Sequence, residues 1–407
     1  MAITDKEQGV WELDEVYNKI NEGGIWTYSA GFEGFYVSGY NQQGNLGQNQ
    51  GPAQRTAVSS PVQIPGTAWE NFNFMTVCGD RSGPVGGVKS DNTMWLWGSD
   101  GDGELGQNTR NVHQSSPTQL PGSWNSITYG HQAMAAAKTD GTMWTWGNNF
   151  SGQLGANFGP SNPYNRSSPI QVGTDTTWGG GYTGTFNNGQ SNKVNGGAYF
   201  FSAVKTDGTW WAWGNGNAGQ LGQNEQLPYN QGRSSPVQIG TDTDWSTLAT
   251  GLRYDNVCIK TDGTAWGCGA NGEGQMMRND KTYRSSPTQI PGTWKSFSGG
   301  GDSAGGVKTD GTAWTCGRNN YGQLGVNDRT NISSPKQIPG TWDYIQISDM
   351  NCVGLKSDNT LWAWGRNQYG GLSQNNIVAL SSPTQIPGFY FSTALSTRSK
   401  IFATKGS

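Results

Sequence analysis

Residues 305–338 read GGVKTDGTAWTCGRNNYGQLGVNDRTNISSPKQI, and they contain three of the four strand signals of one repeat, with the turns between them. Residues 305–308 and 313–316 are short runs that predict two strands. Trp314 and Cys316 lie on one face of the second run, because strand side chains alternate. Asp310-Gly311 between the runs predicts a two-residue hairpin turn, since both residues tolerate positive φ. Residues 294–297 before this pair and 334–338 after it predict two more strands, which makes a unit of four.

The same signals recur along the chain at intervals of about 50 residues. Ser-Ser-Pro occurs seven times, and the six spacings between its copies are 56, 52, 67, 51, 48 and 48 residues. Lys-Thr/Ser-Asp-Gly/Asn-Thr occurs six times, each time just before a Trp-x-Trp or Trp-x-Cys pair, and a Gly-x-Leu-Gly turn then follows. The six motifs start at Lys89, Lys138, Lys205, Lys260, Lys308 and Lys356.

Four strands in each of many repeats predict a β-propeller. A four-stranded blade cannot bury both of its faces alone, whereas a closed ring of blades buries them and leaves no long edge. The last repeat stops after residues 402–407, where a hairpin should follow, and residues 34–41 match the missing third strand. The sequence therefore predicts an all-β fold: a seven-bladed propeller of four-stranded antiparallel blades over residues 31–407, with a closing blade shared by the two chain ends.

Composition excludes several classes of protein. The chain has 407 residues, of which 63 are Gly and 19 are Trp, and only 14% are charged, so it does not resemble a disordered protein. The net charge of −3 argues against nucleic acid as a partner, because phosphate binding needs clustered Lys and Arg. The sequence contains no apolar run of 18 residues, so we expect no membrane insertion. Five Cys in a chain of this length do not indicate a disulfide scaffold.

The Gly-Gln-Leu-Gly, Ser-Ser-Pro and Trp-x-Trp-Gly motifs between residues 35 and 407 resemble the regulator-of-chromosome-condensation repeat family. This resemblance implies a seven-bladed propeller with a shared closing blade. It implies much less about function, because members of the family include exchange factors for small GTPases, protein inhibitors and general interaction platforms. Two units depart from the pattern, at residues 274–277 and 370–373, where Met276-Met277 and Leu372-Ser373 replace Leu-Gly.

Residues 1–30 lie outside the repeats and predict a short helix. Residues 4–7 have the pattern of a capping box, apolar residues follow at intervals of three or four, and Gly23-Gly24 ends the run. Residues 9–20 and 24–28 resemble the leader of structural proteins from marine tailed phages. We therefore predict an anchoring segment, and the alternative is a helix that packs on its own propeller. The candidate anchoring residues are Val10, Trp11, Leu13, Tyr17 and Ile20.

The polar residues that recur suit structural roles better than catalysis. The Asp of each Lys-x-Asp motif is expected to serve a turn, and the Lys two residues earlier to be compensated by that Asp. Asp100-Gly101-Asp102-Gly103-Glu104 resembles part of a calcium loop but lacks the full ligand spacing. His113 and His131 have no partner motif, and the Cys residues fall at positions expected to be buried. We therefore predict that the protein is not an enzyme and uses no cofactor and no metal.

Longer loops mark the candidate partner-binding surface. Residues 48–58, 156–166 and 223–233 make long connections between Gly-x-Leu-Gly and Ser-Ser-Pro, and Trp69–Lys89 and Trp178–Lys205 are longer than their equivalents. We expect both sets to decorate one face of the ring; the alternative is that they are only solvated loops. Tyr, Asn and Arg suit adaptable contacts with protein or glycan. The candidate partner-binding residues are Tyr164, Asn165, Arg166, Tyr229, Asn230 and Arg233.

The function predicted from these features is a non-enzymatic structural or adhesion protein of a tailed-phage virion, attached through residues 1–30. Its partners would be other virion proteins and a glycan or protein of the host surface. The alternative is a cytoplasmic interaction propeller of the GTPase-regulator or inhibitor type. An enzyme that hydrolyses glycans with scattered carboxylates is the weakest reading.

Overall fold

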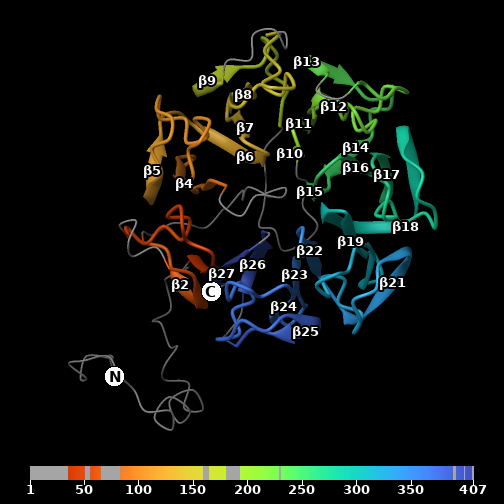
Figure 1. Cartoon of the computed structure of the whole chain (residues 1–407). Coiled ribbons are helices and arrows are strands. Elements are labelled where there is room, and N and C mark those ends of the chain that lie inside the picture. Colours follow the sequence, from red (N-terminus) through yellow and green to blue (C-terminus); the bar gives the residue numbers. More distant parts are fainter. Residues whose placement is uncertain are drawn as a thin grey trace.

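The computed structural model describes residues 35–50, 56–65, 83–158, 165–179, 193–228, 231–387, 391–397 and 399–405. Every regular element in these residues is a β-strand. The sheets stand side by side around a ring, and consecutive sheets follow one another in sequence order (Figure 1). The protein is therefore an all-β propeller, as the sequence predicts. The predicted helix at residues 1–30 and its anchoring residues lie outside the described residues.

Hydrogen bonding joins most strands to strands that lie next to them in the chain, in antiparallel pairs. The first sheets are β3 (Val85–Val88), β4 (Met94–Gly98) and β5 (Gln114–Leu120); β6 (Trp124–Gly130), β7 (Ala133–Lys138), β8 (Met143–Gly147) and β9 (Arg166–Gln171); and β10 (Val194–Gly196), β11 (Phe200–Val204), β12 (Trp210–Asn215) and β13 (Gly232–Gln238).

The next sheet has eight strands because one long strand changes partner and so joins two units, and a short additional strand pairs with it in parallel. β18 (Arg284–Gly301) pairs with β17 (Thr264–Gly269) through its first half and with β19 (Ser303–Lys308) through its second half. The sheet thus contains two consecutive four-stranded units. Its other strands are β14 (Trp245–Leu248), β15 (Thr250–Leu252), β16 (Asp255–Lys260), β20 (Thr312–Gly317) and β21 (Ile332–Thr341). β22 (Tyr344–Ile347), β23 (Asn351–Leu355), β24 (Leu361–Gly365) and β25 (Leu380–Gln385) form the sheet that follows.

Both chain ends build the closing sheet, whose order is β2 (Val58–Gln63), β1 (Phe35–Gly39), β27 (Lys400–Lys405) and β26 (Phe391–Ser396). β1 pairs with β27 over five consecutive residues, from Phe35 with Thr404 to Gly39 with Lys400. The rings of Phe35 and Phe402 stack across this junction with centroids 5.9 Å apart. The predicted sharing of one blade by the two ends is confirmed.

The hairpins between second and third strands differ in one detail from the prediction. The Lys138 amide bonds to the Thr142 carbonyl, and the Gly141 amide returns to the Lys138 carbonyl at 3.0 Å. The loop therefore has three residues, and only its glycine takes positive φ, +81° at Gly141. A third residue in the left-handed region is the usual way to close such a loop, and it replaces the two-residue turn expected from Asp-Gly.

A repeated backbone contact closes the seams, by which we mean the contacts between consecutive units of the ring. The first glycine of each Gly-x-Leu-Gly turn lies against the first serine of Ser-Ser-Pro in the next unit. A methyl group on these glycines would come within 2.4–3.1 Å of the serine Cα. The pairs are Gly44 with Ser115, Gly103 with Ser167, Gly152 with Ser234, Gly219 with Ser285, Gly274 with Ser333, Gly322 with Ser381 and Gly370 with Ser59.

The second tryptophan of each Trp-x-Trp pair crosses the same seam. Its indole N–H donates to the backbone carbonyl of the turn in the preceding sheet, at 2.7–3.0 Å. The four donors are Trp97, Trp146, Trp213 and Trp364, and all are fully buried. Cys268 and Cys316 take this place in two units, with sulfur 3.6 Å from the carbonyl of Gln220 and 2.6 Å from that of Gly274. The tryptophans thus pack between sheets, as predicted.

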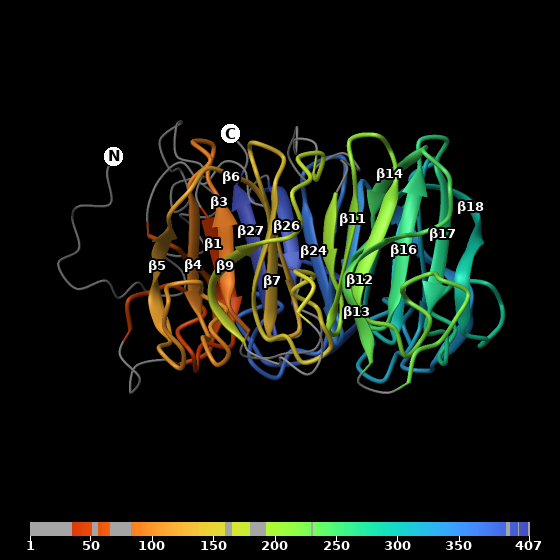
Figure 2. The same ribbon diagram turned by 90° about the horizontal axis from the view of Figure 1, so that it is seen from above.

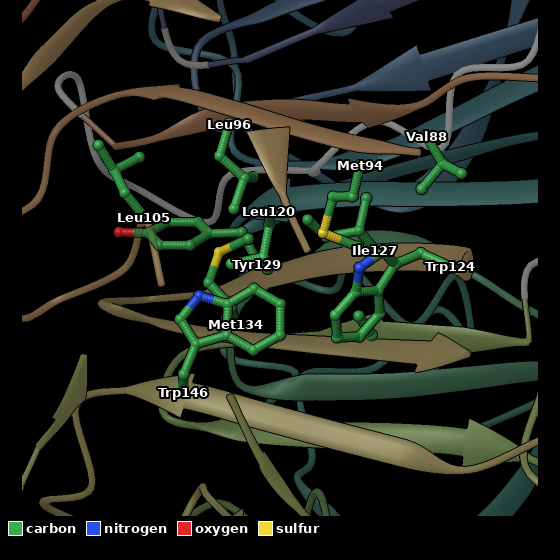
Figure 3. Packing of buried hydrophobic residues seen from close by; sticks show 11 residues of the cluster. Val88, Met94, Leu96, Leu105, Leu120, Trp124, Ile127, Tyr129, Met134 and Trp146 are labelled. Atoms are coloured by element: carbon green, nitrogen blue, oxygen red, sulfur yellow. The ribbon is translucent and has the colours of Figure 1, made fainter. Parts of the chain in front are cut away.

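Figure 3 shows one of these seams, between the β3–β5 sheet and the β6–β9 sheet. Leu96 and Leu105 of the first sheet meet Met134 and Trp146 of the second, all within 1% of complete burial. Burial of aromatic and aliphatic area at about 25 cal/mol per Å² is the main stabilising contribution in such a core.

The strands run between two open ends of the ring, which carry different connections (Figure 2). One end, here called the turn face, carries the three-residue hairpins between second and third strands. The other, the loop face, carries the connections between third and fourth strands and those between first and second strands.

The insertion between Trp178 and Lys205 starts at a different place in its blade from the one predicted. Trp178 bridges to Lys205 at the turn-face end of its blade, and the strand resumes at Val194, which pairs with Ala203. The chain therefore leaves the blade after Trp178 and rejoins it at Val194, near the start of the first strand, and not in the first–second connection. The expectation that both sets of insertions share one face is wrong here, because the register of one strand decides where an insertion emerges. The Trp69–Lys89 insertion lies mostly outside the described residues.

Candidate functional site

The turn face is occupied by a repeated packing of lysine between tryptophans. Lys138 places Nζ 5.2 Å from the ring centroid of Trp124 and 3.8 Å from that of Trp144. Lys205, Lys260, Lys308 and Lys356 lie over two tryptophans in the same way. A cation over an indole face is stabilised by about 0.5–2 kcal/mol, depending on how dry it is. Each lysine also contributes to lowering the pKa of the Asp two residues later, as expected from their spacing. Lys205 and Lys260 form further ion pairs, with Asp175 and with Asp242 and Asp244. Tryptophans and carboxylates thus act together to hold the lysines.

The recurring aspartates serve the hairpins. Asp140 Oδ1 accepts hydrogen bonds from the backbone N–H and the hydroxyl of Thr142, and the Thr142 hydroxyl accepts from the Trp144 indole at 2.8 Å. The hydrogen bonds from Thr142 lower the pKa of Asp140. The same chain of bonds recurs in the other units that carry the motif. These carboxylates therefore stabilise the hairpin loops by accepting hydrogen bonds within them.

The structure describes three of the six candidate partner-binding residues. Asn165 donates through Nδ2 to Asp102 of the preceding sheet and accepts from the Asn149 amide at 3.4 Å. Arg166 is half-buried at the start of β9, with its guanidinium over the Phe158 ring at 4.8 Å. Arg233 is exposed and forms an ion pair with Glu225. Tyr164, Tyr229 and Asn230 lie outside the described residues, so partner binding at these six residues stays a prediction.

Exposed apolar side chains gather on the loop face. Among the described residues, the exposed large hydrophobic side chains are Val112, Phe150, Tyr283, Ile377 and Val378, and each lies in a connection between third and fourth strands. Ile377 and Val378 are the most exposed, at 68% and 61%. Single exposed apolar residues are common on protein surfaces, but these five, from four different units, all lie in the same class of connection.

Ile377 and Val378 form an apolar tip that is held rigidly. Asn367 Nδ2 donates to the Asn376 carbonyl at 2.9 Å, and the Val378 amide donates to Asn376 Oδ1 at 2.8 Å. Asn319 with Asp328, and Asn271 with Asp280, anchor the equivalent connections in the same way. Those two tips present Lys281-Thr282 and Arg329-Thr330. One backbone frame therefore carries an apolar pair in one unit and a charged residue in two others.

Tyrosine and arginine contacts continue across three consecutive units of the loop face. The guanidinium of Arg366 lies over the ring of Tyr321 in the preceding unit, 4.9 Å from its centroid. Tyr40 of the closing sheet meets Tyr369 edge-on, with centroids 5.1 Å apart. Tyr and Arg are the residue types that most often dominate binding energy at protein interfaces. Sequence reasoning missed these four residues because their contacts join different units, which the pattern within one repeat does not show.

The residues weighed for metal or redox chemistry have internal partners. Asp100 Oδ1 accepts from the Leu105 amide, and the His113 Nδ1 accepts from the Asp100 amide at 3.0 Å, so His113 is not incidental. His131 contacts the Tyr199 ring at 4.6 Å. In the part of the chain that the structure describes, no three His, Cys, Asp or Glu residues are grouped as metal ligands. Burial raises the pKa of the Cys316 thiol to about 12, which disfavours the reactive thiolate.

A family model for the RCC1-like domain matches residues 34–403 of this chain. The chain belongs to the RCC1-like domain family. The match covers the propeller from the first residues of β1 to the last strand. It does not extend to residues 1–33, and no comparison supports the resemblance of that segment to phage leaders.

Solved structures of this fold are similar over nearly the whole RCC1-like domain. Human WBSCR16 has a TM-score of 0.76 at 18% identity, with 92% of this chain and 99% of that chain covered. Prp20p from Saccharomyces cerevisiae has a TM-score of 0.76 at 16% identity, with 93% of each chain covered. Yeast RCC1 (Prp20) bound to Kap60 has a TM-score of 0.74 at 16% identity, with 93% and 90% covered. At these identities the likeness shows the fold alone.

No curated protein sequence matches the chain. A search of the described residues finds no helix with the length and apolar character needed to cross a membrane.

Proposed function

We propose that the protein is a non-enzymatic interaction platform that binds a partner protein on the loop face of its propeller. The observation that carries this proposal is the position of the exposed large hydrophobic side chains, all of which, among the described residues, lie in loop-face connections. The turn face offers less to a partner, because its tryptophans and lysines contact one another. A rigid scaffold that presents variable connections at one end is a common basis for binding.

The relatives support a platform of this kind. Prp20p is described with binding properties toward Gsp1p and histones, and yeast RCC1 (Prp20) is bound to Kap60. These partners are stated for those proteins alone. They favour the hypothesis that this protein is a cellular protein-interaction propeller over the hypothesis that it is a virion protein. A regulator or inhibitor role, and a cytoplasmic location, are part of this proposal.

The proposal includes a ring of seven four-stranded blades. The seven Gly–Ser seams and the division of the eight-stranded sheet into two units support this number. The sheet of β3, β4 and β5 has three described strands, and residues 66–82 before it lie outside the described residues. A role in a tailed-phage particle rests on residues 1–30 alone and stays a prediction.

The apolar tip provides the test. The double variant Ile377→Arg/Val378→Thr copies the tip of the β19–β21 unit, so it removes apolar surface and keeps the backbone frame. We expect affinity for a captured partner to fall by on the order of 10-fold or more, as for a central apolar contact. The measurement is quantitative affinity capture from a lysate of the source cells, followed by titration of the captured partner against both proteins.

Asp262→Asn on the turn face is the matched control, because Asn keeps the acceptor oxygen of the hairpin. We expect its binding to equal that of the wild type. If the tip variant binds as well as the wild type while Asp262→Asn weakens binding, the partner site lies on the turn face and the proposal is wrong.

A further inference from the structure

The seam between the β3–β5 sheet and the β6–β9 sheet contains a buried glutamate. Glu104 is 3% exposed and belongs to the turn Gly103-Glu104-Leu105-Gly106. Its carboxyl Oε2 accepts from the Asp102 amide at 2.7 Å. Its backbone carbonyl accepts the indole N–H of Trp146 across the seam, also at 2.7 Å. Leu105 and Trp146 on either side belong to the core of Figure 3.

Four other turns of the ring have glutamine at this position. In each, the side-chain Oε1 accepts from the amide two residues earlier, at 2.8–3.1 Å. In three of them the side-chain nitrogen then donates to a second acceptor: Gln153 to Asn148 Oδ1, Gln220 to Asn215 Oδ1 and Gln323 to Ser303 Oγ. Glutamate has a second oxygen where glutamine has this nitrogen. A carboxylate cannot donate there, but a protonated carboxyl group can.

The charges around Glu104 also oppose its ionisation. Its own loop contributes Asp100 and Asp102, and Asp102 is paired with Arg110 at 3.5 Å. His113 is bound to the Asp100 amide on the same side. The β6–β9 sheet contributes the uncharged Trp146 and Asn165, and its Arg166 lies over Phe158. Burial is the largest cause that raises the pKa of Glu104, to about 8, and the charges of Asp102 and Asp100 add to it. Hydrogen bonds from the backbone amides of Glu104 and Asp102 act in the opposite direction and only partly offset the burial.

We propose that Glu104 is a neutral carboxylic acid in the closed ring, standing in for glutamine, and that release of its proton loosens this one seam. At this turn position Glu104 differs from the four glutamines by a single functional group. Asp102 also holds Asn165, at the root of the loop over residues 156–166, so the loosened seam adjoins one of the candidate binding loops.

The sign of the pH dependence follows from linkage. The closed ring holds the proton more tightly than the open or unfolded chain, where a glutamate titrates near 4.5. The contribution of Glu104 to the free energy of unfolding is complete below pH 4.5 and falls as the pH rises from there. Above a pH of about 8 the carboxyl group is ionised in both the closed and the open state, and the contribution is lost. One proton changes the opening constant by at most about 10-fold per pH unit in that window.

Hydrogen exchange of the full-length protein at pH 6 and pH 8, corrected for intrinsic rates, tests the proposal. In the wild type we expect opening of the segment 103–108 to increase by up to about 100-fold between the two values. Glu104→Gln should remove this increase. Gln153→Glu should transfer it to the segment 152–157 of the next seam.

Equal pH dependence in the wild type and in Glu104→Gln would overturn the proposal. A direct titration of Glu104 tests the proposal even if the Gln153→Glu variant does not fold. The carbon-13 signal of the Glu104 carboxyl group should titrate well above its ordinary range, and titration near 4.5 would also overturn the proposal.

Discussion

We expect the Gly370→Ala variant to lose about 2–5 kcal/mol of unfolding free energy, because it disturbs the seam that closes the ring. Gly370 has φ +71°, where an alanine is strained by about 1–2 kcal/mol. The added methyl group would also lie 2.4 Å from the Cα of Ser59 in the closing sheet. Overpacking of this kind costs about 1–3 kcal/mol more. Equilibrium urea unfolding followed by circular dichroism measures the loss.

Gly173→Ala is the control for backbone strain. Gly173 has φ +61°, and a methyl group there would meet nothing within 4 Å. The Gly173→Ala variant should therefore lose only the about 1–2 kcal/mol of unfolding free energy that comes from backbone strain. If both variants are destabilised equally, Gly370 does not contact the closing sheet as described.

Trp364→Ala is expected to cost about 3–5 kcal/mol, as for other large aromatic residues removed from a core. Trp364 is completely buried, donates its indole N–H to the Gln323 carbonyl at 2.9 Å and packs 5.6 Å from the ring of Trp342. The loss therefore combines a cavity with an unsatisfied carbonyl group. Urea unfolding again provides the measurement.

Trp364→Phe separates the two contributions. Phenylalanine retains most of the buried ring and cannot donate, so the Gln323 carbonyl loses its partner at a cost of about 1–3 kcal/mol. We expect the order wild type, Trp364→Phe, Trp364→Ala in stability. A Trp364→Ala variant within 1 kcal/mol of the wild type would show that this tryptophan is not a seam residue.

The repeat allowed most of the fold to be predicted from the sequence. Four strand signals in residues 294–338 correspond to the second half of β18 and to β19, β20 and β21. The incomplete last repeat correctly predicted the pairing of β1 with β27. Two features were predicted wrongly, the length of the hairpin loops and the exit of the insertion after Trp178, because both depend on the register of single residues.

The candidate site was less predictable, because its features depend on contacts between units. The lysines contact tryptophans that are distant in sequence, as Lys205 contacts Trp178. The apolar tip had a usable signal: alignment of the repeats places Ile377-Val378 opposite Lys281-Thr282 and Arg329-Thr330. Glu104 also aligns with glutamine, but its burial and its bond to Asp102 appear only in the folded ring.

The closed ring is tested most directly by a disulfide between the two ends of the chain. Tyr36 and Ala403 are register partners in β1 and β27, so their Cα atoms fall within the range that a disulfide can span. The double variant Tyr36→Cys/Ala403→Cys should form this bond under mild oxidation, and non-reducing peptide mapping should recover the two ends as one cross-linked species. The pair Tyr36→Cys/Lys336→Cys, which joins β1 to β21 of another unit, should not. Free thiols at positions 36 and 403, or equal cross-linking in both variants, would contradict a ring closed by its two ends.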